Sequence, residues 1–439
     1  MNFLVHRFEC DVPASPTGPF AGVPLLIKDT AMAVAGEKLT SGSQFHADVI
    51  SGSDGTLAKR YREAGFVFLG RTNVPELALS FTTEGDFHGI ARNPWDPERT
   101  PGGSTGGGAA AVAAGVVPIA QGSDGAGSIR VPAAHCGVFG LKPSRIRNPS
   151  GPAMGVGNAG MGTPHAVTRS VRDCARLLDA TSGPDIGDAY AVPPPARPYA
   201  DEIEREPGQL RIGLVLEAPD GAEYDDDCRV AATAAARLCE DLGHAVELIE
   251  PELDHSGLKW AWRTIAATSA ARGIDKAAAA RGIDDPLSQL EPVTAEWIRL
   301  GRSVSGIDYL GAVQVLEASS RTMGRFFERC DIFLSPTTAQ VAPRLGFLRD
   351  DSVGFEQSYN RFWNHAPHAP AFNASGCPAM SVPLHWTEGG LPVGVQFGAA
   401  FGNEGLLVSL AAQLERAKPW FHRRPDLKWM ATPVAEATS

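Results

Sequence analysis

Paired cysteines, an excess of basic charge and long apolar runs are all missing from this 439-residue sequence. Its seven cysteines are scattered without a Cys-x-x-Cys pair, which predicts neither a disulfide framework nor a zinc site and favours a reducing cytoplasm. The formal net charge of −11 argues against binding to nucleic acid or an anionic membrane surface, since both attract clustered Lys and Arg. No run approaches the ~18 apolar residues of a membrane span, and the start lacks a secretory signal pattern. We therefore expect a cytoplasmic protein with a small-molecule partner.

Short β-rich runs alternate with alanine- and leucine-rich helical patterns along the chain, which is typical of an α/β protein. The expected strands are 65–70, 116–121, 211–216, 331–335 and 393–397, and the expected helices are 105–114, 227–242 and 405–417. Length alone favours two or three domains. The proline-rich and acidic stretch 191–208 either separates two domains or connects the halves of one large sheet.

The first of two glycine-rich runs, "PGGSTGGGAAAV" at 101–112, places Ser104 in a Gly-x-Ser-x-Gly pattern. That pattern is typical of the nucleophile of α/β-hydrolases, but there a hydrophobic strand precedes it, whereas "RNPWDPERTPGG" is a polar loop. Locally, a helix start with Ser104 or Thr105 as N-cap fits better. A phosphate-binding turn is a weaker alternative because no Gly-Lys-Ser/Thr follows.

The second run, "GSDGAGSIRVP" at 122–132, can turn several backbone N–H groups toward one point beside Ser128. Such a nest would serve as an oxyanion hole. The alternative is an ordinary tight turn, across which Asp124 and Arg130 pair for structural reasons.

No histidine lies between these runs to take a proton from either serine, and His135 in "PAAHCGVFG" fits a packed, hydrogen-bonded residue. Lys28 ends the apolar run "GVPLLIK" instead. Burial there would favour its neutral amine, which makes Lys28 a usable base. A solvated Lys-Asp ion pair is the alternative interpretation of this position.

The sequence resembles the amidase signature hydrolases over nearly its whole length. The likeness is carried by a set of long, ordered motifs: "GPFAGVPLLIKD", "AGFVFLGRTNVPEL", "RNPWDPERTPGGSTGGGAAAVAAG", "GSDGAGSIRVPAAHCGVFGLKPS", "RSVRDCARLLD", "FNASGCPAMSVPL" and "GLPVGVQFGAAFGNEGLL". Within the family, the motifs look most similar to the branch that opens the cyclic dimer of 6-aminohexanoate. Urethane-cleaving and aryl-acylamide-cleaving members share the framework.

This resemblance implies a Ser-cisSer-Lys triad, with Ser128 as nucleophile, Ser104 as bridging serine after a cis peptide bond, and Lys28 as base. The two serines stand 24 positions apart, as the family's motifs require. The implied oxyanion-hole donors are the backbone N–H groups of Gly125, Ala126, Gly127 and Ser128, and the implied supporting residues are Asp124 and Arg130.

The implied fold is one α/β domain, 1–439, with a mixed, twisted central sheet covered by helices and 191–208 as a surface connection. No metal and no cofactor are implied, and we expect a monomer or homodimer. Three features depart from the family pattern. We expect that the helices usual upstream of the first strand are either missing or not captured in this sequence, because Lys28 is only 27 residues in. Ala126-Gly127 replaces Gly-Gly, and Thr105 replaces a serine.

The expected function is hydrolysis of an amide or carbamate. The alternatives are the A-type subunit of a tRNA-dependent amidotransferase and a catalytically inactive binding protein. We expect the substrate pocket to be walled by variable loops at 150–165 and 355–371, which contain apolar candidates for its lining: Met154, Met161, Phe355, Tyr359, Phe362 and Trp363.

Overall fold

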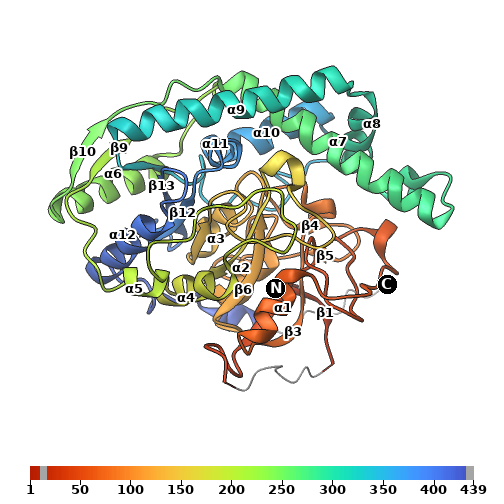
Figure 1. Cartoon of the computed structure of the whole chain (residues 1–439), viewed down its shortest axis with the longest axis horizontal. Helices are drawn as coiled ribbons and strands as arrows, with labels where there is room; N and C mark the ends of the chain where they lie inside the picture. The colour runs from red at the N-terminus through yellow and green to blue at the C-terminus, as the bar shows by residue number, and fades with distance from the viewer. Residues whose placement is uncertain (10–16, 432–439) are drawn as a thin grey trace.

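The computed structural model describes residues 1–9 and 17–431, and an 11-stranded mixed sheet runs through it in the order β1-β3-β2-β6-β8-β7-β12-β13-β11-β9-β10 (Figure 1). The strands are β1 (Leu4–Arg7), β2 (Pro24–Lys28), β3 (Val67–Thr72), β6 (Ile119–Asp124), β7 (Phe139–Lys142), β8 (Thr163–Thr168), β9 (Arg211–Leu214), β10 (Ala245–Leu248), β11 (Ile332–Pro336), β12 (Ala379–Trp386) and β13 (Pro392–Ala399). The short strands β4 (Glu84–Gly85) and β5 (Gly89–Ile90) form a separate antiparallel pair. Strand β2 is parallel to both β3 and β6, so the carboxyl ends of β2 and β6 meet at one edge of the sheet.

Helices cover both faces of the sheet. They are α1 (Thr56–Glu63), α2 (Gly106–Ala113), α3 (Arg130–Cys136), α4 (Val171–Thr181), α5 (Tyr199–Glu202), α6 (Asp226–Asp241), α7 (His255–Arg281), α8 (Pro292–Ser303), α9 (Gly306–Arg329), α10 (Phe355–His365), α11 (Ala369–Ser375) and α12 (Glu404–Ala417). Figure 1 shows α9 across the top of the molecule, α7 and α8 at its upper right, and α4, α5, α6 and α12 at its left.

Alternating side chains on the central strands explain the two covered faces. Leu25 and Ile27 of β2 pack in one cluster with side chains of α1 and α4, whereas Leu26 packs in another with α2 and α3. Successive side chains of a strand point to opposite faces, so a strand buried on both sides is apolar at nearly every position. The run "PLLI" before Lys28 has this pattern.

The α/β class and the mixed sheet are confirmed. The expected strand and helix segments are all present with shifted ends; for example, strand 116–121 is observed as β6, three residues further along the chain. The stretch 191–208 contains α5, whose Tyr199 is buried against α12 and α4, so it does not separate two domains. The expected loop at 355–371 is wrong, because α10 and the start of α11 occupy it.

Within residues 1–9 and 17–431, no helix has the length and apolar composition that a bilayer crossing requires.

The close approach of α7 and α8 generates a prediction about stability. A methyl group added at Gly301 of α8 would overlap the carbonyl oxygen of Ala267 on α7. We expect Gly301→Ala to lower the free energy of unfolding by about 1–3 kcal/mol, because the two packed helices must move apart. Urea-denaturation midpoints measure this change.

Gly324 of α9 is the matched control, since an added methyl group there would meet no atom within 4 Å. Gly324→Ala is expected to raise the free energy of unfolding by about 0.5–1 kcal/mol, through the helix preference for alanine. Equal midpoints for the two variants would contradict the packing argument.

Candidate active site

Three segments that are far apart in the sequence bring Lys28, Ser104 and Ser128 to one edge of the sheet. Lys28 ends β2, Ser128 follows the end of the parallel neighbour β6, and Ser104 lies in the loop before α2. The N–H of Thr105 donates to the carbonyl oxygen of Ser128 at 3.2 Å, which ties the two glycine-rich runs together. The peptide bond between Gly103 and Ser104 is cis.

Lys28 is completely buried, and its Nζ lies 2.7 Å from Ser104 Oγ. Two further contacts, each 3.1 Å, join Nζ to the carbonyl oxygen and the hydroxyl of Ser123. A neutral amine has two N–H donors and one lone pair, so donation to the two Ser123 oxygens leaves the lone pair for the Ser104 hydroxyl. Burial lowers the pKa of Lys28 from 10.5 to about 7, against the opposing charge of Asp124.

The interpretation of Lys28 as half of a solvated Lys-Asp ion pair is wrong. Its neighbour Asp29 is also buried and accepts hydrogen bonds from the backbone N–H and the hydroxyl of Thr40. Thr105 does occupy the N-cap position of α2, but its side chain makes no capping hydrogen bond. The expected helix start with Thr105 at the N-cap is therefore confirmed, without a side-chain cap.

The loop between β6 and α3 is held by its carbonyl and carboxylate oxygens. The Asp124 carbonyl accepts from Asn373 Nδ2 at 2.9 Å, and the Gly125 carbonyl accepts from Trp262 Nε1 at 2.9 Å. Within residues 1–9 and 17–431, the four N–H groups from Gly125 to Ser128 have no hydrogen-bond acceptor. The loop therefore presents free donors beside Ser128, which is the arrangement that an oxyanion requires.

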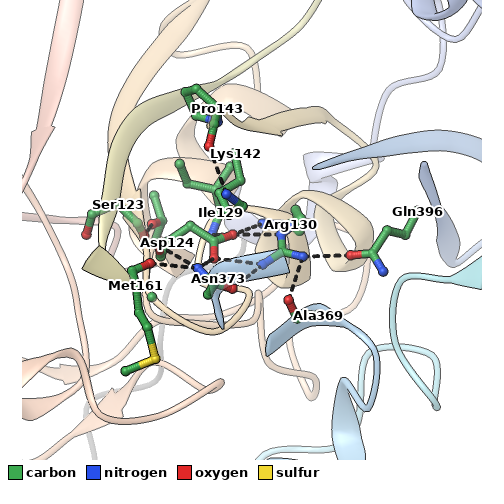
Figure 2. A network of polar contacts seen from close by, with 12 residues as sticks. Ser123, Asp124, Ile129, Arg130, Lys142, Pro143, Met161, Ala369, Asn373 and Gln396 are labelled. Carbon is green, nitrogen blue, oxygen red and sulfur yellow. Dashed lines mark hydrogen bonds and ion pairs between the residues drawn. The ribbon is translucent and has the colours of Figure 1, made fainter. Parts of the chain in front are cut away.

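Figure 2 shows the ion pair that anchors this loop, with dashed lines joining both Arg130 and Asn373 to Asp124. Arg130 Nη2 and Nε lie 2.9 Å and 3.0 Å from the two Asp124 carboxylate oxygens, and both side chains are fully buried. The remaining Arg130 donors reach the Ala369 carbonyl, Gln396 Oε1 and Asn373 Oδ1 at 2.7–2.9 Å. All five N–H groups of the guanidinium thus have acceptors. The predicted pairing of Asp124 with Arg130 is confirmed.

Burial alone would raise the pKa of Asp124, but the charge and hydrogen bonds of Arg130 hold it well below its usual range. Lys142 of β7 is a second buried lysine near this pair, and it donates to the Pro143 carbonyl at 2.8 Å. Burial and the charge of Arg130 lower the pKa of Lys142 to about 7. The Asp124 carboxylate is therefore paired with Arg130, and Lys28 and Lys142 both have a pKa of about 7.

A cavity of about 390 Å³ opens over Ser104, Ser123 and Ser128. Of the residues expected in its wall, Met154, Met161 and Phe362 line it. The expectation is wrong for three others: Phe355 and Tyr359 line a smaller neighbouring cavity of about 60 Å³, and Trp363 lines neither. The only ionised side chain among the lining residues is Asp124, whose charge is paired. This lining suits an uncharged molecule with apolar parts.

Sequence reasoning missed three residues that contact the site: Ser123, Asn373 and Trp262. Ser123 precedes Asp124 in the second glycine-rich run, and Asn373 lies in the motif "FNASGCPAMSVPL". Their positions within these motifs are the signal that could have identified both residues. Trp262, on α7, belongs to no motif. His135 is buried as predicted, with its Nε2 3.1 Å from His365 Nε2.

No group of three or more His, Cys, Asp or Glu side chains in the described part of the chain is arranged to hold a metal ion.

Comparisons with known proteins agree on one family. A family model described as amidase matches residues 7–408. The chain is 39% identical over 428 residues to the 6-aminohexanoate-cyclic-dimer hydrolase of Paenarthrobacter ureafaciens, covering 94% of this chain and 86% of that protein. A solved structure of 6-aminohexanoate cyclic dimer hydrolase with its substrate superposes with a TM-score of 0.88 at 38% identity, covering 94% and 88% of the two chains.

Two other solved structures are less similar. A bacterial aryl acylamidase of the amidase signature family has a TM-score of 0.83 at 27% identity, covering 92% of this chain and 84% of its own. The A-type subunit of glutamyl-tRNA(Gln) amidotransferase from Thermotoga maritima has a TM-score of 0.77 at 28% identity, covering 95% and 88%. The chain therefore resembles the amidotransferase subunit less than it resembles the cyclic dimer hydrolase.

The buried ion pair generates a prediction. Arg130→Met leaves the Asp124 carboxylate buried without its counter-charge, so we expect a loss of about 3–5 kcal/mol in the free energy of unfolding. Arg302→Met is the control, because Arg302 pairs with Asp275 at 2.6 Å on the surface, where both side chains are at least 40% exposed. That variant should lose under about 1 kcal/mol. Urea denaturation at pH 7 measures both, and similar losses would contradict the argument.

Proposed function

Because the chain belongs to the amidase family, we propose that it hydrolyses uncharged, mostly apolar amides, anilides or carbamates through Ser128, Ser104 and Lys28. The observation that carries the proposal is the 2.7 Å contact between the buried Lys28 Nζ and Ser104 Oγ at the cavity that Ser128 also lines. A lysine with a pKa of about 7 is a base matched to neutral pH. The reaction uses no metal, ATP or tRNA.

In the first step, Ser128 Oγ attacks the carbonyl carbon while its proton passes to Ser104 Oγ, and the Ser104 proton passes to neutral Lys28. The carbonyl oxygen becomes an oxyanion, which the backbone N–H groups of 125–128 stabilise. One such donor is typically worth about 2.7–4 kcal/mol in the transition state. Ala126 supplies a backbone N–H as a glycine at this position would.

In the second step, the protonated Lys28 returns its proton through Ser104 to the leaving amine nitrogen, and the carbon–nitrogen bond breaks. The product is an acyl ester on Ser128. Water then attacks this ester by the same relay and releases the acid. For a carbamate, the same attack expels an amine or an alcohol.

The character of the cavity supports an uncharged substrate. Met161, Trp262, Phe362 and Ile274 supply apolar surface, and Ser41 and Asn158 are polar but uncharged. A charged substrate would lose its hydration without gaining a counter-ion there. The relative that acts on a cyclic amide dimer, an uncharged molecule, agrees with this choice.

Substitution of the relay residues tests the proposal. Ser128→Ala should abolish turnover, and Ser104→Ala and Lys28→Met should each lower kcat by about 10²–10⁴-fold, because the nucleophile then lacks a path for its proton. The measurement uses nitroanilides, the cyclic dimer of 6-aminohexanoate and small aromatic carbamates. Unchanged urea midpoints would show that the variants are folded.

Glutamine and asparagine serve as contrasting substrates in the same panel. If the chain hydrolysed only these free amino acids, the amidotransferase alternative would replace our proposal. If full activity remained in Lys28→Met at neutral pH, the relay would be wrong even though the chain is an amidase.

The pKa of Lys28 predicts the pH dependence. Only the neutral amine accepts a proton, so kcat/KM should fall about tenfold per unit as the pH drops below about 7, and should level off above it. His46 also lines the cavity, but burial lowers its pKa below 6.5, so its protonation comes later on acidification. A rate profile on a neutral anilide measures this, and constant kcat/KM down to pH 5 would exclude Lys28 as base.

A further inference from the structure

Trp262 contacts the oxyanion loop from outside the family motifs. It lies on α7 with 6% of its surface exposed, and its indole Nε1 donates to the Gly125 carbonyl at 2.9 Å. The two residues are separated by 137 positions in the sequence. This contact is made to the backbone of the loop whose N–H groups are free.

The geometry of a peptide unit turns this contact into a constraint on catalysis. In the trans peptide between Gly125 and Ala126, the carbonyl oxygen and the N–H lie in one plane and point in opposite directions. Holding the Gly125 oxygen therefore fixes the direction of the Ala126 N–H. If this peptide rotated by half a turn, a carbonyl would stand where a donor is required.

The backbone of Gly125 is not held by packing, so a hydrogen bond is needed to fix its orientation. A methyl group added at Gly125 would meet no atom within 4 Å, so packing does not hold this residue. The preceding carbonyl, that of Asp124, is held by Asn373. Trp262 therefore supplies the side-chain hydrogen bond to the Gly125–Ala126 peptide in the described part of the chain.

The indole itself is held rigidly by other aromatic rings. Its centroid lies 5.1 Å from Phe362 and 5.9 Å from Trp297, and it stacks on Tyr359 at 6.3 Å. These rings come from α8 and α10, so three helices fix the direction of the indole N–H. A rigid donor restricts the peptide more than a mobile one.

We propose that Trp262 is a positioning residue for the proposed amidase reaction: its indole N–H holds the Gly125–Ala126 peptide so that the Ala126 N–H faces the oxyanion. This inference rests on the proposed function. The same ring lines the substrate cavity, so a role as mere wall is the competing explanation.

Trp262→Phe keeps an aromatic ring and removes the N–H. We expect kcat to fall about 10- to 100-fold with KM changed less than threefold, because a misplaced oxyanion donor weakens only the transition state. Inhibition by phenylboronic acid, which forms a tetrahedral adduct with a nucleophilic serine, should weaken by a similar factor. Replacing Trp262 with benzothienylalanine, whose sulfur takes the place of the N–H in a ring of the same shape, should give the same loss.

Tyr359→Phe is the matched control. It removes the 2.7 Å hydrogen bond from the Tyr359 hydroxyl to the carbonyl of Lys259, which lies on α7 as Trp262 does. The Tyr359 ring belongs to the aromatic group around Trp262 and is kept as phenylalanine. We expect kcat and phenylboronic acid inhibition to remain within about twofold of the unmodified protein, since the oxyanion loop is untouched.

Three outcomes would overturn the inference: unchanged kcat in both Trp262 variants, a rise in KM alone, or an equal fall in kcat in Tyr359→Phe. The first two outcomes would mean that Trp262 only lines the cavity. The third would mean that the fall in kcat comes from a displacement of α7. In all three, hydrolysis by the unmodified protein and its loss in Ser128→Ala would leave the proposed function standing. If the unmodified protein hydrolysed none of the panel, the function and this inference would both fail.

Discussion

The ion pair of Asp124 and Arg130 is the interaction on which the rest of the site depends. A buried carboxylate is costly unless its charge and its lone pairs are met, and here the guanidinium, Asn373 and two backbone N–H groups meet them. Because the same carboxylate binds the N–H groups of Ile129 and Arg130, it closes the loop that begins at Gly125. Among the residues that the structure describes, the N–H groups from Gly125 to Ser128 then have no hydrogen-bond acceptor.

The pair also determines the chemistry of the neighbouring lysine. The Asp124 carboxylate lies near three basic side chains, those of Arg130, Lys28 and Lys142. Its short contacts are to Arg130, which stays charged at every accessible pH. Lys28 and Lys142 are buried without a carboxylate of their own, so their neutral forms are favoured. In the proposed reaction, Lys28 is the proton acceptor because the Asp124 counter-charge is paired with Arg130.

The parts of this arrangement that could be predicted are those encoded by contiguous residues. An apolar run ending in Lys28 describes a buried strand with a basic end, and the glycines around Ser128 describe a backbone nest. Trp262 and Asn373 reach the loop across 137 and 249 positions, and nothing local marks such a contact. The long helix α7 was missed for a related reason: it packs against α8, α9 and α11 on different sides, so no single apolar stripe identifies it.

The aromatic group around Trp262 has a consequence for how such an enzyme acquires new substrates. Cavity walls usually tolerate substitution best, since the reacting groups lie elsewhere and are left intact. Here one wall residue also contacts the backbone beside Ser128, the proposed nucleophile. Under our proposal the wall therefore divides into a permissive part, near Met154 and Asn158, and a part that is coupled to turnover. Natural or laboratory selection for bulkier amides should therefore accumulate changes on the permissive side and spare the indole.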